Sequence, residues 1–255
     1  MPKIKEFAAK LLLALGYSIK STTKKSLIQR VWSEGSDFSI SRTQEKVLLR
    51  HSKSQLGQDL LGLSVSGLDK PGFFVEFGAA DGVALSNSHI LEKHFGWTGI
   101  LCEPSTGWHE ALKKNRSCNI DTRCVYSVSG EKISFSENYL GELSAITAFV
   151  EPNANGVLKR TTSSYVVETV SLLDLLKFHN APKFIDFLSI DTEGSEFEIL
   201  EKFDFQSYRF GAICVEHNFA DTRGKINKLL LASGYVQVYK DLSDFDDWYV
   251  HDTNR

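Results

Sequence analysis

Cysteine, methionine and long apolar runs are scarce in this chain of 255 residues. It has four cysteines and one methionine. The cysteines form no C-x-x-C pair and lie near no histidine at zinc-finger spacing, so neither a disulfide framework nor a zinc finger is expected. No run approaches the ~20 apolar residues that a membrane-spanning helix needs. We therefore expect a globular, cytoplasmic protein with buried, reduced cysteines.

The chain also lacks the excess of positive charge that is typical of nucleic-acid-binding proteins. Its net charge is −3, and residues 1–30 carry seven basic side chains against one acidic side chain. The rest of the chain therefore has a net charge of −9. A body this acidic is unsuited to a phosphate backbone, so we expect no nucleic-acid partner.

The basic start of the chain predicts an extension that precedes the main domain. Apolar residues recur at helical spacing between Ile4 and Leu15, which indicates a short basic amphipathic helix. We assign residues 1–50 to this helix and a helical extension, and residues 51–255 to the main domain. The helix is expected to pack on the body or mediate self-association, or else to contact an anionic membrane at its inner face. We expect residues 1–40 to be dispensable for chemistry.

Apolar strands and amphipathic helices alternate from residue 72 onward. Strands are expected at 73–77, 98–102, 122–128, 184–190 and 211–215, with helices at 88–95, 107–115, 171–179, 195–202 and 225–233. Segments 235–240 and 247–251 predict an antiparallel hairpin. The pattern predicts a Rossmann-like α/β fold with a doubly wound, mainly parallel seven-stranded sheet that ends in this hairpin. Such an ending is typical of methyltransferases and disfavours a nicotinamide oxidoreductase.

A glycine turn follows the first predicted strand, with the spacing E-x-G-x-x-x-G formed by Glu76, Gly78 and Gly82. Glycine lets the backbone turn sharply against a ligand at the carboxyl end of a strand. The turn is not the G-x-G-x-x-G fingerprint of dinucleotide binding, and no G-x-x-x-x-G-K-[ST] loop occurs. A ligand without a pyrophosphate is therefore favoured.

S-adenosylmethionine fits these residues, because it has an amino acid end and a ribose diol but no phosphate. Glu76 is expected to organise the turn and to reach the amino acid end through water. Glu103, after the second strand, is expected to accept both ribose hydroxyls, as the equivalent acid of Rossmann enzymes does. The residues predicted to surround this cofactor are Glu76, Gly78, Ala80, Asp81, Gly82, Asn87, Glu103 and Pro104.

Five motifs occur in an order that resembles the FkbM-type methyltransferase family. They are FVEFGAADG (74–82), CEP (102–104), VETVSLLDLL (167–176), SIDTEGSE (189–196) and VEHN (215–218). The resemblance covers residues 55–239. It implies S-adenosylmethionine as methyl donor and O-methylation, commonly of sugar hydroxyls in cell-surface glycans or of natural products.

The chain departs from the family pattern at two positions. Family members often show D-x-G-A-N-x-G, where this chain has Glu76 in place of the aspartate and Ala80 in place of the asparagine. The contact made by that asparagine is therefore expected from another residue, such as Asn87. A non-catalytic binding protein with this fold is the alternative, although it would be expected to lose the cofactor residues.

Ionisable residues follow the fourth and fifth predicted strands, whose carboxyl ends meet at one edge of the sheet. Asp191 and Glu193 follow one strand, and Glu216, His217 and Asn218 follow the next. His217 is predicted to accept the proton of the acceptor hydroxyl, with Glu193 as the alternative and Asp191 beside them. Asp191, Glu216 and Asn218 are candidate ligands for Mg²⁺ or Mn²⁺. Structural hydrogen bonds at the strand ends, without any metal, are the other explanation.

Overall fold

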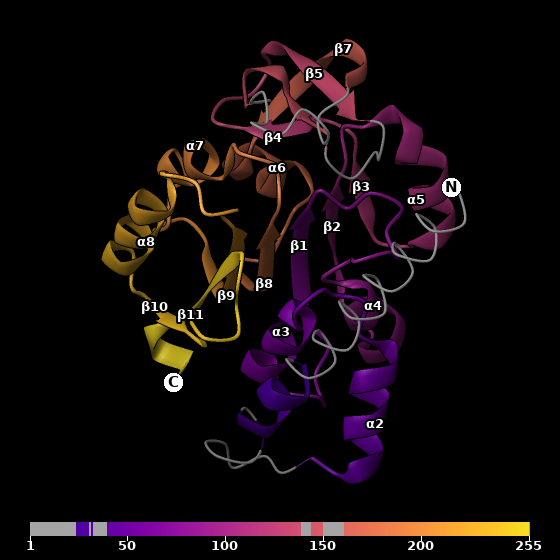
Figure 1. Cartoon of the computed structure of the whole chain (residues 1–255), viewed down its shortest axis with the longest axis vertical. Coiled ribbons are helices and arrows are strands. Elements are labelled where there is room, and N and C mark those ends of the chain that lie inside the picture. The colour runs from indigo at the N-terminus through magenta and orange to yellow at the C-terminus, as the bar shows by residue number, and fades with distance from the viewer. Residues whose placement is uncertain (1–23, 31, 33–39, 139–143, 150–160, 255) are drawn as a thin grey trace, which may run out of the picture.

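The computed structural model describes residues 24–30, 32, 40–138, 144–149 and 161–254 (Figure 1). The amphipathic helix predicted in the first 20 residues lies outside them. Among the described residues, no helix is long and apolar enough to cross a membrane.

A seven-stranded sheet forms the centre of the domain, as predicted. Its strand order is β10-β11-β9-β8-β1-β2-β3. The strands are β1 (Phe73–Phe77), β2 (Thr98–Cys102), β3 (Asn119–Asp121), β8 (Phe184–Ile190), β9 (Arg209–Glu216), β10 (Tyr235–Val238) and β11 (Asp246–His251). The first five of these run parallel, and the hairpin β10–β11 joins β9 antiparallel. The Rossmann-like methyltransferase fold is therefore confirmed.

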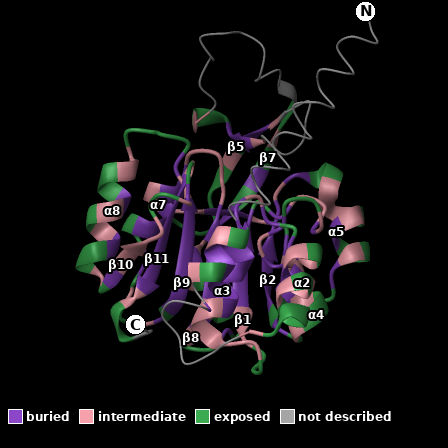
Figure 2. Ribbon diagram, turned by 60° about the horizontal axis from the view of Figure 1, so that its bottom comes forward, coloured by how far each residue is buried: buried purple, intermediate pink, exposed green. Residues whose placement is uncertain are grey.

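Helices cover both faces of this sheet (Figure 2). They are α2 (Arg42–His51), α3 (Gln58–Ser66), α4 (His89–Phe95), α5 (His109–Asn115), α6 (Leu172–Phe178), α7 (Glu196–Glu201) and α8 (Arg223–Ala232). Neighbouring strand residues point to opposite faces. Accordingly, Val75 packs in one core cluster with Leu175 of α6, whereas Phe74 packs in the other with Leu60 of α3.

The strand predicted at 122–128 belongs to a second, smaller sheet and not to the main sheet. The chain leaves the main sheet after β3, and β4 (Cys124–Tyr126) pairs with β7 (Thr161–Ser171) instead. This sheet has the order β4-β7-β5-β6, with β5 (Lys132–Asn138) and β6 (Ala145–Ile146), and it lies above the main sheet in Figure 1. Its β5–β7 ladder is rich in serine and threonine, with Ser134 and Ser164 hydrogen-bonded across it at 2.9 Å. Apolar alternation covers only Ile133 and Phe135 in β5, and β7 begins with four serine and threonine residues at 161–164, so the sequence pattern did not reveal these strands.

The domain boundary predicted at residue 50 is also corrected. Residues 24–30 are helical, and Leu27, Ile28 and Trp32 are buried in the same core cluster as Leu60. The Arg30 guanidinium makes a bidentate ion pair with Asp241, at 2.7 and 2.9 Å. The described part of the extension is therefore integral to the main domain.

Candidate functional site

A cavity opens where the carboxyl ends of β1, β2, β8 and β9 meet the smaller sheet. Six carboxylates line it, and the described lining residues include no lysine, arginine or histidine. Its walls include six of the eight predicted cofactor residues: Glu76, Gly78, Ala80, Asn87, Glu103 and Pro104. A positively charged ligand is therefore electrostatically favoured over an anionic one.

The glycine turn brings the end of β1 against the end of β8. Gly78 has φ +73°, and a Cβ atom there would lie 2.2 Å from the carbonyl oxygen of Asp191. Only glycine fits such a close backbone approach with a left-handed φ. The glycine turn and the residue that follows β8 are thus in direct contact.

Glu103 lies at the end of β2 with its carboxylate facing the cavity and 5% of the residue exposed. Its Oε2 accepts from the backbone N–H of Ala80 at 2.7 Å, and its Oε1 accepts from that of Ser105 at 2.8 Å. Burial raises the pKa of Glu103 to about 7, although both hydrogen bonds lower it. Each oxygen keeps a lone pair, so the carboxylate can accept two further hydroxyl donors.

Glu76 holds the loop that forms the neighbouring wall. Its Oε1 accepts from the N–H of Asn87 at 2.7 Å, and its Oε2 accepts from the hydroxyls of Ser86 and Ser88. The Asn87 amide donates to Ser189 Oγ at 2.9 Å. Its Oδ1 is buried and has no hydrogen-bond partner among the described residues. That oxygen is an acceptor that a ligand can satisfy.

Asp81 and Gly82, two of the predicted cofactor residues, do not line the cavity. Asp81 Oδ1 instead accepts from the N–H groups of Val83 and Ala84, both at 2.8 Å. Gly82 has φ +76°, and a Cβ atom there would lie 2.6 Å from Arg116 Cγ. Both residues therefore stabilise the conformation of the turn without forming part of the cavity wall.

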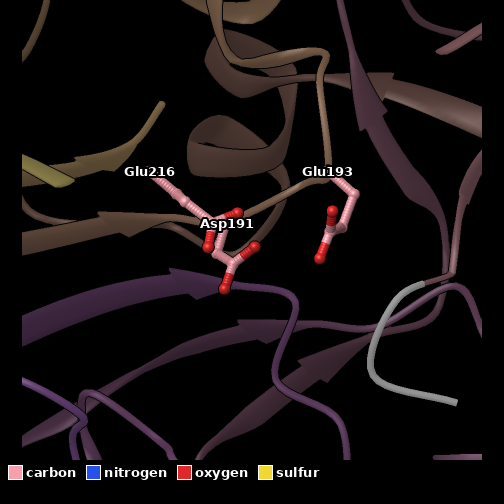
Figure 3. Close-up of side chains that lie close together, drawn as sticks. All are labelled: Asp191, Glu193 and Glu216. Carbon is pink, nitrogen blue, oxygen red and sulfur yellow. The ribbon is translucent and has the colours of Figure 1, made fainter. Parts of the chain in front are cut away.

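Three carboxylates gather at or after the carboxyl ends of β8 and β9, and all three line the cavity (Figure 3). Asp191, Glu193 and Glu216 each have one oxygen within 4.8 Å of the other two. Burial and the neighbouring Glu216 raise the pKa of Asp191 well above its usual range. Burial, opposed by a hydrogen bond with Asp191, raises the pKa of Glu216 to about 8. Asp191 and Glu216 therefore hold a proton to a higher pH than isolated carboxyl groups do, unless a cation lies between them.

His217 does not line this cavity. Its ring Nδ1 accepts from the N–H of Phe219 at 3.0 Å, so the proton of the neutral ring is on Nε2, 3.6 Å from Asp247 Oδ1. Asp247 in turn receives a bidentate pair of hydrogen bonds from Arg223. The geometry does not support His217 as a base for a substrate in this cavity, because it follows Glu216 in the chain and points to the other side of the strand.

Asn218, a predicted metal ligand, is exposed and belongs neither to the cavity wall nor to the carboxylate cluster. Its backbone N–H donates to the carbonyl of Phe245 at 3.2 Å. Glu193 takes its place in the cluster. A cation site here would therefore consist of Asp191, Glu193 and Glu216.

The sequence analysis missed several residues of the cavity wall. Asp246, opposite Glu216 on β11, accepts from the Gln58 amide at 2.6 Å, and burial raises its pKa to about 6. It was missed because the strand was expected to begin one residue later. Phe135, Ser144 and Ile146 line the cavity from the smaller sheet and its connection. The position of segment 142–165 between the cofactor and carboxylate motifs predicts that it shapes the acceptor pocket, and Ser144 and Ile146 belong to it. The sheet that presents them, and with it Phe135, was not predicted.

Solved structures with similar chain traces include several methyltransferases. A methyltransferase FkbM from Methylobacillus flagellatus KT is 13% identical with a TM-score of 0.47, over 90% of this chain and 58% of that one. An O-methyltransferase from Bacillus cereus in complex with SAH is 14% identical with a TM-score of 0.42, over 90% and 97% of the two chains. This chain thus spans less than two thirds of the first protein, and no curated protein matches it significantly.

The family model is the informative comparison. The model of the methyltransferase FkbM domain matches residues 76–250, which include both the glycine turn and the carboxylate cluster. The chain therefore belongs to the FkbM methyltransferase domain family.

Proposed function

We propose that this chain is an S-adenosylmethionine-dependent O-methyltransferase. The observation that carries the proposal is a single cavity that joins Glu103 and the Gly78 turn to the carboxylates of Asp191, Glu193 and Glu216. One side suits a nucleoside with an amino acid tail, and the other suits a hydroxyl that must lose a proton.

The methyl donor would lie across the carboxyl ends of β1 and β2. Both ribose hydroxyls would donate to Glu103, whose two oxygens each have a free lone pair. The amino acid end would lie near Glu76 and the unpaired Oδ1 of Asn87. The sulfonium and ammonium charges suit a cavity lined by six carboxylates.

The carboxylate cluster supplies the proton acceptor. With the donor bound, the acceptor oxygen would attack the methyl carbon in line with the breaking carbon–sulfur bond, and the neutral thioether S-adenosylhomocysteine would leave. The hydroxyl proton passes to a carboxylate of the cluster. We assign this role to Glu193, beside the carboxyl groups of Asp191 and Glu216.

The cluster also fits a Mg²⁺ or Mn²⁺ ion, because three carboxylate oxygens are the hard ligands that these ions take. Asp191, Glu193 and Glu216 would hold it, and its charge would make a bound hydroxyl easier to deprotonate. Without an ion, a proton held between Asp191 and Glu216 would reduce the repulsion between their carboxylates instead.

A sugar hydroxyl of a cell-surface glycan is our proposed acceptor, and a small natural product is the second candidate. Neutral polyols suit the cavity, since carboxylates accept hydrogen bonds from hydroxyl groups. The basic start of the chain remains our candidate for membrane contact or self-association.

The test is transfer of a labelled methyl group from S-adenosylmethionine to a panel of glycans and glycosides. Transfer to an oxygen supports the proposal, and chelator followed by Mg²⁺ or Mn²⁺ tests the metal. Undiminished methyl transfer in excess chelator would show that no metal ion is required, and it would favour a proton held between Asp191 and Glu216. Failure of the wild-type chain to bind S-adenosylhomocysteine would overturn the proposed function itself.

A further inference from the structure

Arg116 lies behind the cofactor side of the cavity. It follows the last residue of α5, and its side chain is fully buried between Glu92 of α4 and the loop that leads out of the glycine turn. It does not line the cavity. Any effect on a ligand must therefore pass through other residues.

The guanidinium group has a partner for each of its five N–H bonds. Nε donates to Glu92 Oε2 at 2.6 Å, and one terminal nitrogen donates to the Gly82 carbonyl at 3.0 Å and to Ser86 Oγ at 3.1 Å. The other donates to Ser88 Oγ at 2.9 Å and to the Ser88 carbonyl at 3.4 Å. Four of these contacts fix the loop of residues 82–88, and lysine could not reproduce this fork.

Two serine hydroxyls connect Arg116 to Glu76. Ser86 and Ser88 each accept from the guanidinium and donate to Glu76 Oε2. The carboxylate lines the cavity, and so do residues 84–87 of the same loop. A displacement of Arg116 would therefore move both the carboxylate and the wall.

The aliphatic part of the Arg116 side chain also explains why residue 82 is a glycine, since Gly82 does not line the cavity. The near contact of 2.6 Å between a Cβ at Gly82 and Arg116 Cγ shows that the turn is packed directly on this side chain. The glycine turn and the loop of residues 82–88 thus contact the buried Arg116 directly, and Glu76 is connected to it through the two serines.

We propose that Arg116 is a positioning residue for the cofactor site, which holds Glu76 and the 84–87 wall in the geometry that receives the amino acid end of the methyl donor. This inference rests on the proposed function. It extends the site to a residue that touches no ligand.

The first test is the affinity of Arg116→Lys for S-adenosylhomocysteine, measured by calorimetry well below the unfolding midpoint. Loss of charge-assisted hydrogen bonds to the loop is expected to weaken binding by about 10-fold or more. Arg209→Lys is the control, because Arg209 stacks on the Phe184 ring, far from the turn along β9, and its affinity should match wild type. Wild-type affinity in Arg116→Lys would overturn the inference while leaving the proposed function intact.

A second variant separates positioning from folding. Ser86→Ala with Ser88→Ala keeps the buried arginine but removes both connections to Glu76, so it should weaken binding too. In the double serine variant, a further Arg116→Lys change should weaken binding less than the same change does in the wild type. The reason is that Arg116 acts on Glu76 through the two serine hydroxyls. A purely structural role predicts a lower unfolding midpoint with unchanged affinity of the folded protein, which would also overturn the inference.

Discussion

Glu103 makes the site sensitive to pH at a single side chain. Its pKa of about 7 means that the carboxylate is protonated below neutrality, and the protonated form has lost acceptor capacity for the ribose hydroxyls. If only the ionised form binds, the dissociation constant of S-adenosylhomocysteine should rise about 10-fold from pH 8 to pH 6. Titration calorimetry across this range measures it.

Glu103→Gln is the matched control for this prediction, since it keeps the shape but does not ionise. Its affinity should be low and nearly constant over the same pH range. A pH profile that persists in this variant would transfer the effect to another carboxylate, such as Asp246 or Glu216.

Glu193 and His217 compete for the role of proton acceptor, and the structure separates them. Glu193→Gln should lower turnover by ~100-fold or more with little change in cofactor affinity, the scale of a lost general base. His217→Asn should lower the unfolding midpoint and change turnover much less, because the ring lies against Asp247 outside the cavity. A large loss of turnover in a fully folded His217→Asn would restore the histidine as base.

Adjacent residues explain why part of the site was predictable and part was not. Glu103 could be placed from the sequence because one acid follows a clear apolar strand. Glu216 and His217 were both assigned to the site, yet neighbours at a strand end point in opposite directions. The sequence did not determine which of the two faces the cavity, since that depends on the pairing of Glu216 with Asp246 across β9 and β11.

At the level of elements, residues 24–30 and Trp32 pack into the core of the domain, although residues 1–40 were expected to be dispensable for chemistry. Leu27, Ile28 and Trp32 are almost completely buried. Each such side chain contributes ~1.5–3 kcal/mol. A chain without residues 1–40 should therefore lose about 5 kcal/mol or more of unfolding free energy, which urea denaturation measures.

A chain without residues 1–23 is the control for this truncation, since it retains the buried helix and the Arg30 ion pair with Asp241. Its urea midpoint should exceed that of the shorter chain. Equal midpoints would mean that the 24–32 segment adds nothing to the core.

Elements with strong apolar patterns were predicted within a few residues, including β1, β2, β8 and β9. The β5–β7 ladder was missed because its many serine and threonine residues mask the apolar pattern, although Ile133, Phe135, Tyr165 and Val167 form an apolar face in the structure. Its stability comes from pairing over seven registered positions and from packing of Phe135 against Tyr165, both of which are contacts between distant residues. Such contacts leave no local signature.

At the scale of the whole molecule, the cavity has walls from two sheets, and we expect the wall from the smaller sheet to help select the acceptor. Ile146→Ala in the smaller sheet should change the ratio of rates among acceptors. It should leave the affinity for S-adenosylhomocysteine within about 5-fold, because the donor is assigned to residues of the main sheet and a truncated wall side chain contributes ~1 kcal/mol or less to its binding. Val166→Ala, at a side chain of the same sheet that is 64% exposed, should change neither quantity. An equal effect of both variants would argue against acceptor selection by this wall.

The smaller sheet has one more property, which follows from its place in the chain. All four of its strands lie between β3 and α6, in one continuous stretch from Cys124 to Ser171. Every residue that we assign to the methyl donor or to proton removal lies before or after this stretch. Exchange of this stretch between related chains would leave in place every residue that we assign to delivery of the methyl group, so we expect such an exchange to alter which acceptor is methylated.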